Sequence, residues 1–149
     1  MTKERGFWGI AFYEPKMEEN IGTAIRSAHC FGVDFLAVIG KRYRKEPTDT
    51  TAAERHIPIY EYADLEDFKK HLPLKCEIVD VEVDGEDITN FVHPERAVYL
   101  IGGEDRTLPK VGKYRVKFNT DYCLNMAMAA TLISYDPKLK NELKRLIKK

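Results

Sequence analysis

Short apolar segments alternate along this chain with segments that carry a helical pattern of apolar residues, and this alternation is the strongest constraint on its fold. The segments that read as strands are Phe7–Tyr13, Phe35–Ile39, Cys76–Val83, Ala97–Ile101 and Tyr114–Phe118. Continuous apolar runs of this kind are typical of strands buried on both faces. Strands that alternate with helices favour a mainly parallel sheet with helices on both faces. We therefore predict an α/β fold in which residues 1–149 form a single domain.

The first helical segment, Met17–Phe31, carries a charged residue that the core does not need. At about 100° per residue, one face of this helix collects the apolar side chains of Ile21, Ala24, Ile25, Ala28 and Phe31. Arg26 falls well away from that face. Asn20 is placed to cap the start of the helix, and Gly32 is placed to end it. Taken alone, the segment fits an ordinary capped helix with a solvated arginine, and this interpretation stays open beside a functional one.

The middle of the chain adds shorter elements. Ile57–Tyr60 reads as a short strand whose pairing is limited by proline. Asp64 can cap a helix that runs to about His71. We interpret Arg42–Arg55 as a loop and Asp84-Gly85 as a turn.

Near the end of the chain we predict two helices. The first runs from about Leu124 to Tyr135, and Asp136-Pro137 ends it and starts the second. The second helix has an apolar stripe formed by Leu139, Leu143, Leu146 and Ile147.

Composition argues against several classes of protein. No apolar run approaches the roughly 18–20 residues that span a bilayer, and the start of the chain lacks a signal-peptide pattern, so we expect a cytoplasmic protein without a membrane partner. The 24 basic and 24 acidic residues cancel, which gives no overall attraction to nucleic acid. We expect Cys30, Cys76 and Cys123 to be reduced, buried thiols. The histidines show no metal-ligand spacing with these cysteines, so no metal is expected.

Three loops that follow predicted strands carry glycine or polar residues: 14–22, 102–109 and 119–125. In open parallel sheets, ligands bind beyond the carboxyl ends of the strands. None of these loops contains G-x-G-x-x-G, G-x-x-x-x-G-K-[ST] or G-x-S-x-G, which argues against a usual dinucleotide site, nucleotide hydrolysis and a serine hydrolase. Because the three loops are expected to meet at one edge of the sheet, a functional role for Arg26 gains support.

Three segments together resemble the SpoU (TrmH) class of SPOUT RNA methyltransferases. The first is Asn20–Gly32, with asparagine, glycine and arginine in the family's order. The second, Leu100–Pro109, resembles G-x-E-x-x-G-L-P, with Thr107 where glycine is usual. The third, Phe118–Asn125, resembles the I-P-T or I-P-M segment that precedes S-L-N and an alanine-rich helix. In that third segment, asparagine stands where proline is customary and cysteine where serine is common. The likeness covers nearly the whole chain.

This resemblance implies a trefoil-knotted α/β fold, a homodimer and S-adenosylmethionine as methyl donor. It also implies methylation of a ribose 2′-hydroxyl in tRNA or rRNA by a single methyltransferase domain, without the extra RNA-binding domain of some family members. The implied cofactor-binding residues are Val81, Gly102, Phe118, Thr120, Cys123 and Leu124.

The implied catalytic residues are Arg26, Asn20, Glu104 and Asn125. Arg26 would hold a neighbouring phosphate and the negative charge that develops on the ribose oxygen. Because a guanidinium hardly deprotonates, the base is a substrate phosphate or Glu104 rather than Arg26. Asn20 would orient Arg26 or the ribose, and Asn125 would hold Glu104. The plainer interpretations are a turn carboxylate for Glu104 and a helix cap for Asn125.

Substrate RNA would meet a basic run with one aromatic residue inside it: Arg42, Tyr43, Arg44 and Lys45. Tyr43 is suited to stack on a base. Two other functions stay open at this point. The chain could be a non-catalytic RNA-binding relative of the same fold, or an unknotted, flavodoxin-like nucleotide binder.

Overall fold

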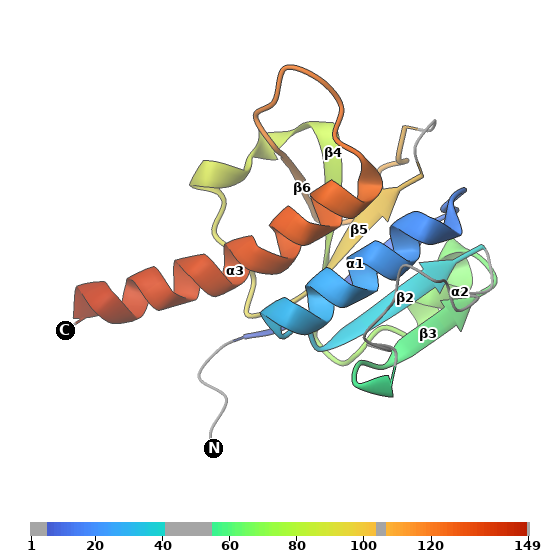
Figure 1. Cartoon of the computed structure of the whole chain (residues 1–149), viewed down its shortest axis with the longest axis horizontal. Coiled ribbons are helices and arrows are strands. Elements are labelled where there is room, and N and C mark those ends of the chain that lie inside the picture. Colours follow the sequence, from blue (N-terminus) through green and yellow to red (C-terminus); the bar gives the residue numbers. More distant parts are fainter. Residues whose placement is uncertain (1–5, 41–54, 104–106, 149) are drawn as a thin grey trace.

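A parallel sheet forms the centre of the molecule in the computed structural model, which describes residues 6–40, 55–103 and 107–148 (Figure 1). The strands are β1 Phe7–Tyr13, β2 Phe35–Ile39, β3 Ile59–Tyr62, β4 Glu77–Asp87, β5 Arg96–Gly102 and β6 Tyr114–Lys117. Within the described part they lie in the order β3-β2-β1-β5-β4-β6, and every neighbouring pair is parallel. The mainly parallel α/β sheet predicted from the sequence is confirmed.

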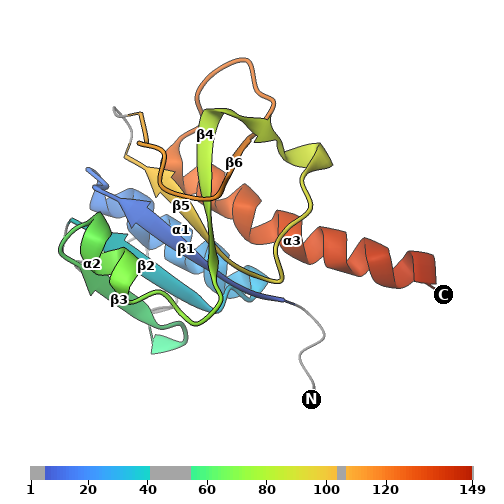
Figure 2. The ribbon, with the colours of Figure 1, turned by 180° about the vertical axis from the view of Figure 1, so that it is seen from behind.

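The helices are α1 Glu18–Phe31, α2 Leu65–Lys70 and α3 Met126–Lys148, with a short 3₁₀ turn, η2 Ile88–Asn90. Helices α1 and α3 lie side by side on one face of the sheet, and α2 lies on the other face near β3 (Figures 1 and 2). Each face therefore has its own apolar core. Tyr99, Ile10 and Ile21 belong to the core beneath α1 and α3, and Phe68 of α2 belongs to the other core.

Four of the five residues predicted for the apolar face of α1 are fully buried, namely Ile21, Ala24, Ile25 and Ala28, and Phe31 is partly buried. Gly32 ends the helix at φ 75°, in the left-handed region that glycine adopts at little cost. The predicted cap was wrong, because the helix starts earlier: Met17 precedes it and makes no side-chain capping bond, so Asn20 lies in the first turn. Asp64 does cap α2, accepting from the Asp67 amide at 2.8 Å.

Strand β4 continues through the predicted turn at Asp84-Gly85, so that turn was wrong. The strand shifts its register against β6 between Val81 and Glu86 and then resumes pairing. Gly85 permits this close approach, because a Cβ there would lie 2.5 Å from the backbone nitrogen of Val116.

The two helices predicted near the end are one helix, α3, with Pro137 inside it. A proline in a helix interior leaves one carbonyl without its usual donor, which favours a break. Here the ion pair Lys140–Asp136, at 2.8 Å, spans the proline, and Lys138–Glu142, at 2.6 Å, follows it. The helix continues through the proline, and these pairs add a modest stabilisation to its turns.

Three further sequence predictions met different outcomes. Strand β3 begins two residues later than predicted, although the Pro58 carbonyl accepts from Leu36 N at 2.8 Å. The cysteines are free, but Cys30 and Cys123 are exposed, so the expectation of buried thiols was wrong for these two. Most of the predicted loop from residue 42 to residue 55 lies outside the described residues.

Among the described helices, none combines the length and apolar character that a bilayer crossing requires.

Candidate functional site

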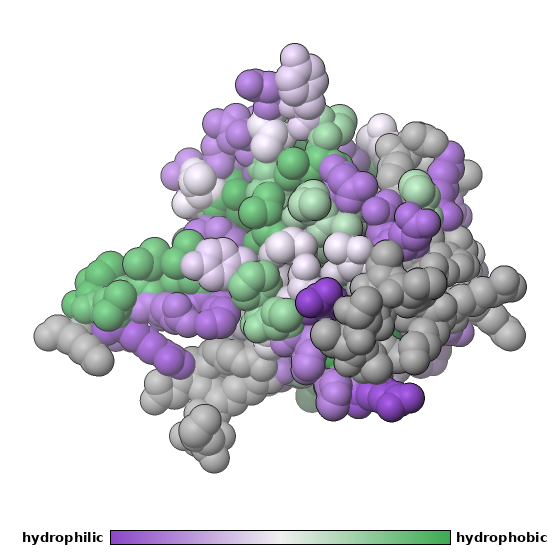
Figure 3. All heavy atoms as spheres, viewed as in Figure 1, coloured by the Kyte–Doolittle hydropathy of each residue, from purple (hydrophilic) through white to green (hydrophobic). Residues whose placement is uncertain are grey.

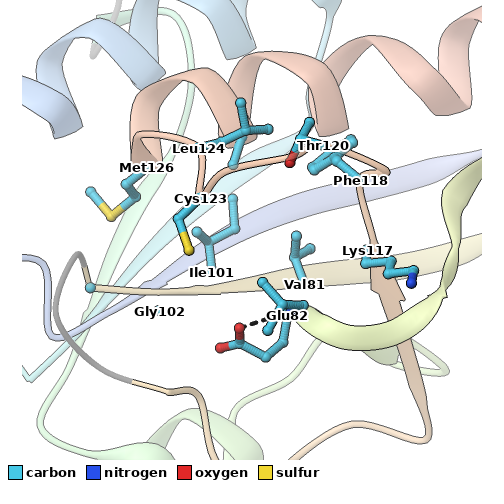
Figure 4. A pocket seen from close by; sticks show the side chains of 13 residues that line it. Val81, Glu82, Ile101, Gly102, Lys117, Phe118, Thr120, Cys123, Leu124 and Met126 are labelled. Atoms are coloured by element: carbon cyan, nitrogen blue, oxygen red, sulfur yellow. Dashed lines mark hydrogen bonds between the residues drawn. The ribbon is translucent and has the colours of Figure 1, made fainter.

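An open pocket lies between the middle of β4, the ends of β5 and β6 and the start of α3 (Figure 4). The space within it, including the part open to solvent, is about 720 Å³, within the range of small-molecule sites. Its walls are formed by Val81, Glu82, Val83, Ile101, Gly102, Gly103, Lys117, Phe118, Thr120, Cys123, Leu124, Met126 and Ala129. Most of these side chains are apolar, and Glu82 and Lys117 are the two ionisable groups besides the Cys123 thiol.

The glycine pair at the end of β5 lets two strand ends approach each other. A Cβ on Gly103 would lie 2.6 Å from the carbonyl oxygen of Glu14, which follows β1. Any side chain at this position would therefore push β1 and β5 apart. The pocket wall formed by Gly102 and Gly103 depends on this close contact.

All six residues that the sequence assigned to a cofactor line this one pocket: Val81, Gly102, Phe118, Thr120, Cys123 and Leu124. They come from β4, β5 and the connection between β6 and α3. Hydrogen bonds fold that connection into a compact turn, with Thr120 N donating to Phe118 O at 3.0 Å and Thr120 Oγ1 donating to Tyr122 O at 2.8 Å.

Asn20 and Asn125, two of the predicted catalytic residues, are in contact. Asn125 Nδ2 donates to Asn20 Oδ1 at 3.3 Å, and this bond joins the first turn of α1 to the loop before α3. Asn125 Oδ1 also accepts from Ala127 N at 2.8 Å. Asn125 is thus a helix cap, as the plainer interpretation stated, and it is also a bridge to the segment that carries Arg26.

Arg26 lies on the exposed side of α1 and is not among the residues that line the pocket. It follows Asn20 by six residues, which is about 9 Å along a helix. The turn of α1 that contains Arg26 is held against α3 by a hydrogen bond, in which Thr131 Oγ1 donates to Ser27 Oγ at 2.9 Å.

The remaining predicted site residues lie outside the described part of the chain. They are Glu104 and the basic run of Arg42, Tyr43, Arg44 and Lys45.

Sequence reasoning missed Glu82 and Lys117. Both stand in strands, where alternation alone suggests solvent-facing charge, and neither belongs to a motif. A signal was nevertheless present, because both residues lie within a residue of a predicted cofactor residue, Val81 or Phe118.

A charged cluster stands beside the pocket on the same face of β4 as Glu82. Arg115 Nη1 donates to buried Asp80 at 3.1 Å, and its Nε donates to Asp84 at 2.5 Å. Burial alone would lower the pKa of Arg115, but Asp84 and Asp80 outweigh that effect and raise it. The hydrogen bond from Arg115 lowers the pKa of Asp84. The cluster is thus fully ionised near neutral pH at Arg115 and Asp84.

In the part of the chain that the structure describes, no group of three or more His, Cys, Asp or Glu side chains could hold a metal ion. The arrangement instead suits an organic ligand that places apolar surface against the walls and polar groups toward backbone and the two charges.

Comparison with known proteins identifies a family. The model of the SpoU rRNA Methylase family matches residues 9–135. No curated protein matches the chain by sequence.

Several solved structures share the fold. The SpoU methyltransferase AviRb from Streptomyces viridochromogenes, in complex with the cofactor AdoMet, superposes with a TM-score of 0.79 at 23% identity, over 91% of this chain and 58% of its own. The A. aeolicus TrmH/SpoU tRNA modifying enzyme gives 0.77 at 18% identity, over 98% of this chain and 81% of its own. A protein studied for the 2-OH methylation of C/U34 on tRNA gives 0.77 at 20% identity, over 89% and 95%. The chain spans about three fifths of the length of AviRb.

Proposed function

The chain belongs to the SpoU rRNA methylase family, and from this premise we propose that it transfers a methyl group from S-adenosylmethionine to RNA. The observation that carries the proposal is the pocket between the middle of β4, the carboxyl end of β5 and the connection from β6 to α3. Its walls contain every residue that the sequence assigned to the cofactor. The similarity to AviRb, which was crystallised with AdoMet, supports the same cofactor.

The finer proposal is methylation of a ribose 2′-hydroxyl in tRNA or rRNA. It is supported by the three-part motif of the sequence. Similarity to the protein studied for 2-OH methylation of C/U34 on tRNA also supports it.

The pocket suits the cofactor by its chemistry. Ile101, Leu124 and Phe118 offer apolar surface to a flat adenine ring. Gly102 lines the pocket without a side chain and is only partly buried, so its backbone can meet a ligand. Lys117 offers a positive charge to the carboxylate of an amino-acid moiety.

When bound, the cofactor supplies a methyl group on a positively charged sulfur, which the ribose 2′-oxygen takes up as its own proton leaves. The residues of the chain hold the reactants in line, and such positioning can supply several kcal/mol. Arg26 stabilises the negative charge on the oxygen, and Asn20, held by Asn125, orients Arg26 or the ribose. The proton passes to a substrate phosphate or to Glu104. Within one chain Arg26 does not line the pocket, and we propose that the RNA or a second copy of the chain completes the site.

A homodimer is part of the proposal. We define the α3 stripe as Met128, Leu132, Tyr135, Leu139, Leu143 and Leu146, which recur every three or four residues along one side of α3. All but Leu139 are exposed large apolar or aromatic side chains. Figure 3 shows the apolar surface over the C-terminal part of α3. Such a continuous exposed face favours a partner helix, and a second copy of this chain is the partner we propose.

The substrate RNA would bind through the basic run of Arg42, Tyr43, Arg44 and Lys45. Arginine and lysine would contact phosphates, and Tyr43 would stack on a base.

The test is transfer of labelled methyl from S-adenosylmethionine to total tRNA or rRNA by the purified chain, followed by digestion to nucleosides. We expect label in 2′-O-methylnucleosides, and none in DNA of matched sequence, which lacks the acceptor hydroxyl. Absence of label together with absence of cofactor binding by calorimetry would overturn the proposal. Cofactor-independent RNA retention, with an Arg26→Ala variant that behaves as the parent in cells, would favour the non-catalytic relative.

A further inference from the structure

Glu82 is a pocket residue with no role in the function proposed above. It follows Val81 on β4, is partly buried, and lines the pocket wall that also contains Ile101. A carboxylate beside apolar surface is costly unless hydrogen bonds compensate for the water it has lost. The bonds that Glu82 makes therefore indicate what it can do.

Two backbone N–H groups hold the Glu82 carboxylate. Its Oε1 accepts from Val83 N at 2.8 Å, the bond drawn in Figure 4, and its Oε2 accepts from Leu108 N at 2.9 Å. Leu108 is itself fixed, because its side chain is buried and its carbonyl accepts from Arg115 Nη2 at 2.7 Å. The carboxylate is thus fixed in place before any ligand arrives.

Asp80, two residues earlier on the same face of β4, provides a contrast. Its oxygens accept from Val111 N at 3.0 Å, Gly112 N at 2.9 Å and Arg115 at 3.1 Å. Asp80 is completely buried and does not line the pocket, so its oxygens accept hydrogen bonds from the protein itself and not from a ligand. A carboxylate can accept about four hydrogen bonds. Glu82, with two donors from the described chain, retains capacity for a ligand.

We propose that Glu82 is a ligand-binding residue of the pocket, whose carboxylate accepts a hydrogen bond from a donor group of the bound cofactor. This inference rests on the proposed function, because it takes S-adenosylmethionine as the ligand. The cofactor has two kinds of donor that a carboxylate prefers, the ribose hydroxyls and the amino group of the methionine moiety. Either donor would form the same kind of hydrogen bond with the Glu82 carboxylate, and an experiment can distinguish between them.

The experiment compares Glu82→Gln with the parent by calorimetric titration with S-adenosylhomocysteine and with 5′-methylthioadenosine, which keeps the ribose but lacks the amino acid. Glu86→Gln is the matched control, because Glu86 is an exposed glutamate on the same strand outside the pocket. Glu82→Asp, which keeps the charge on a shorter side chain, is the second variant. We expect Glu82→Gln to bind S-adenosylhomocysteine about 10-fold more weakly, as hydrogen bonds to charged groups imply. Glu86→Gln should stay within about twofold.

An equal loss for both ligands supports contact with the ribose, and a loss for S-adenosylhomocysteine alone supports contact with the amino group. Binding of both ligands within twofold of the parent, by Glu82→Gln and by Glu82→Asp, overturns the inference and leaves the proposed function intact. A parent that binds neither ligand overturns both.

A purely structural role for Glu82 is tested by amide hydrogen exchange and thermal unfolding without ligand. We expect faster exchange at the Leu108 amide in Glu82→Gln, with an unfolding midpoint close to that of the parent. If the midpoint falls steeply and affinity falls only with it, Glu82 is a structural residue and the inference is wrong.

Discussion

Arg26 occupies a helix position that contributes nothing to the core. It lies on the exposed side of α1, while the opposite side buries Ile21, Ala24, Ile25 and Ala28. Substitution of this exposed residue tests whether its long cationic side chain serves methyl transfer.

We predict that Arg26→Ala lowers methyl transfer at least about 100-fold, the usual effect of removing one group that stabilises developing negative charge. Arg26→Lys should retain part of the activity, since it keeps the charge but loses the planar fork. The thermal unfolding midpoint should stay within about 1 °C for both, because exposed substitutions rarely matter to stability. Transfer by Arg26→Ala at more than half the parental rate would remove Arg26 from the mechanism.

Asp136 joins α3 to the connection between β4 and β5. Its carboxylate accepts from His93 Nε2 at 2.5 Å and from Lys140 at 2.8 Å, while His93 Nδ1 lies 2.6 Å from the Tyr99 hydroxyl. Burial alone would raise the pKa of Asp136, but the bonds from His93 and Lys140 outweigh that effect and lower it from its usual value. Burial raises the pKa of the Tyr99 hydroxyl, so this group stays protonated.

A carboxyl with a lowered pKa in the folded state stabilises the fold above its unfolded-state pKa, and that stabilisation disappears as the pH falls through the folded-state value. Asp136→Asn should therefore be less stable than the parent at pH 7. The difference between the two should shrink as the pH falls below about 4. Thermal unfolding of both proteins from pH 7 to pH 3 checks this, and a difference that stays constant over that range would show that ionisation of Asp136 does not contribute.

Single-residue predictions succeeded where one local rule decided the outcome. The buried face of α1, the closing Gly32 and the cap at Asp64 all follow from spacing and from backbone preference. Capping by Asn20 failed because α1 begins before it, and Asn125 is the asparagine that caps a helix. Both asparagines stand near the start of a predicted helix, so the sequence alone does not show which of them caps. In the structure Asn125 caps α3 and also donates to Asn20.

At the scale of elements, the pocket depends on strand ends that approach closely. The Leu-Ile-Gly-Gly sequence that ends β5 brings it against the residues after β1, and Gly103 leaves no room for a side chain there. The connection that follows β5 is therefore restricted by the space available to its backbone as well as by its contact with the pocket.

We predict that Gly103→Ala destabilises the protein by about 2 kcal/mol, because the backbone of Glu14 must move away from the new Cβ. Cofactor affinity should fall as well, since Gly103 lines the pocket. Chemical denaturation and calorimetry measure the two effects. Lys110→Ala, an exposed change in the same connection, should alter neither. Unchanged stability of Gly103→Ala would show that the strand ends adjust freely.

The sequence predicted which segments form strands and helices, but it did not predict where those strands and helices end. Strand β4 and helix α3 both run through residues that usually stop such elements, Gly85 and Pro137. In β4 the pairing with β6 resumes after a register shift, and in α3 one ion pair spans the proline and a second follows it. Long-range pairing and side-chain contacts decide such cases, and neither is visible in local sequence.

At the scale of the whole molecule, the α3 stripe is an exposed apolar surface that a single chain does not cover. It runs along a helix that extends away from the sheet (Figure 1), and Leu143 and Leu146 are 46% and 66% exposed. A second subunit would cover this stripe, and it would also offer a second Arg26 to the site.

We predict that the parent sediments as a dimer and that the double variant Leu143→Glu and Leu146→Glu sediments as a monomer, because like charges would then face each other across the interface. Lys144→Glu, an exposed change off the stripe, should leave the dimer intact. Sedimentation equilibrium distinguishes these states. A monomeric parent at about 100 μM, or a dimeric double variant, would contradict this assignment of the interface.

The order of motifs along the chain predicted the composition of the pocket better than any single motif did. Val81, Gly102 and Leu124 are far apart in sequence and meet because β4 pairs with β5 up to Val81 and Ile101, beside the connection that leads into α3. At the level of the sequence, the trefoil knot and the dimer followed from the resemblance, and both stay predictions. Glu82 and Lys117 required the structure.

The most direct measurement is a crystal structure of the chain grown with S-adenosylmethionine. The account predicts density for the cofactor between β4, β5 and the start of α3, in contact with Val81, Gly102 and Leu124. Density at another place, or none in crystals grown at a concentration that saturates binding in solution, would contradict it.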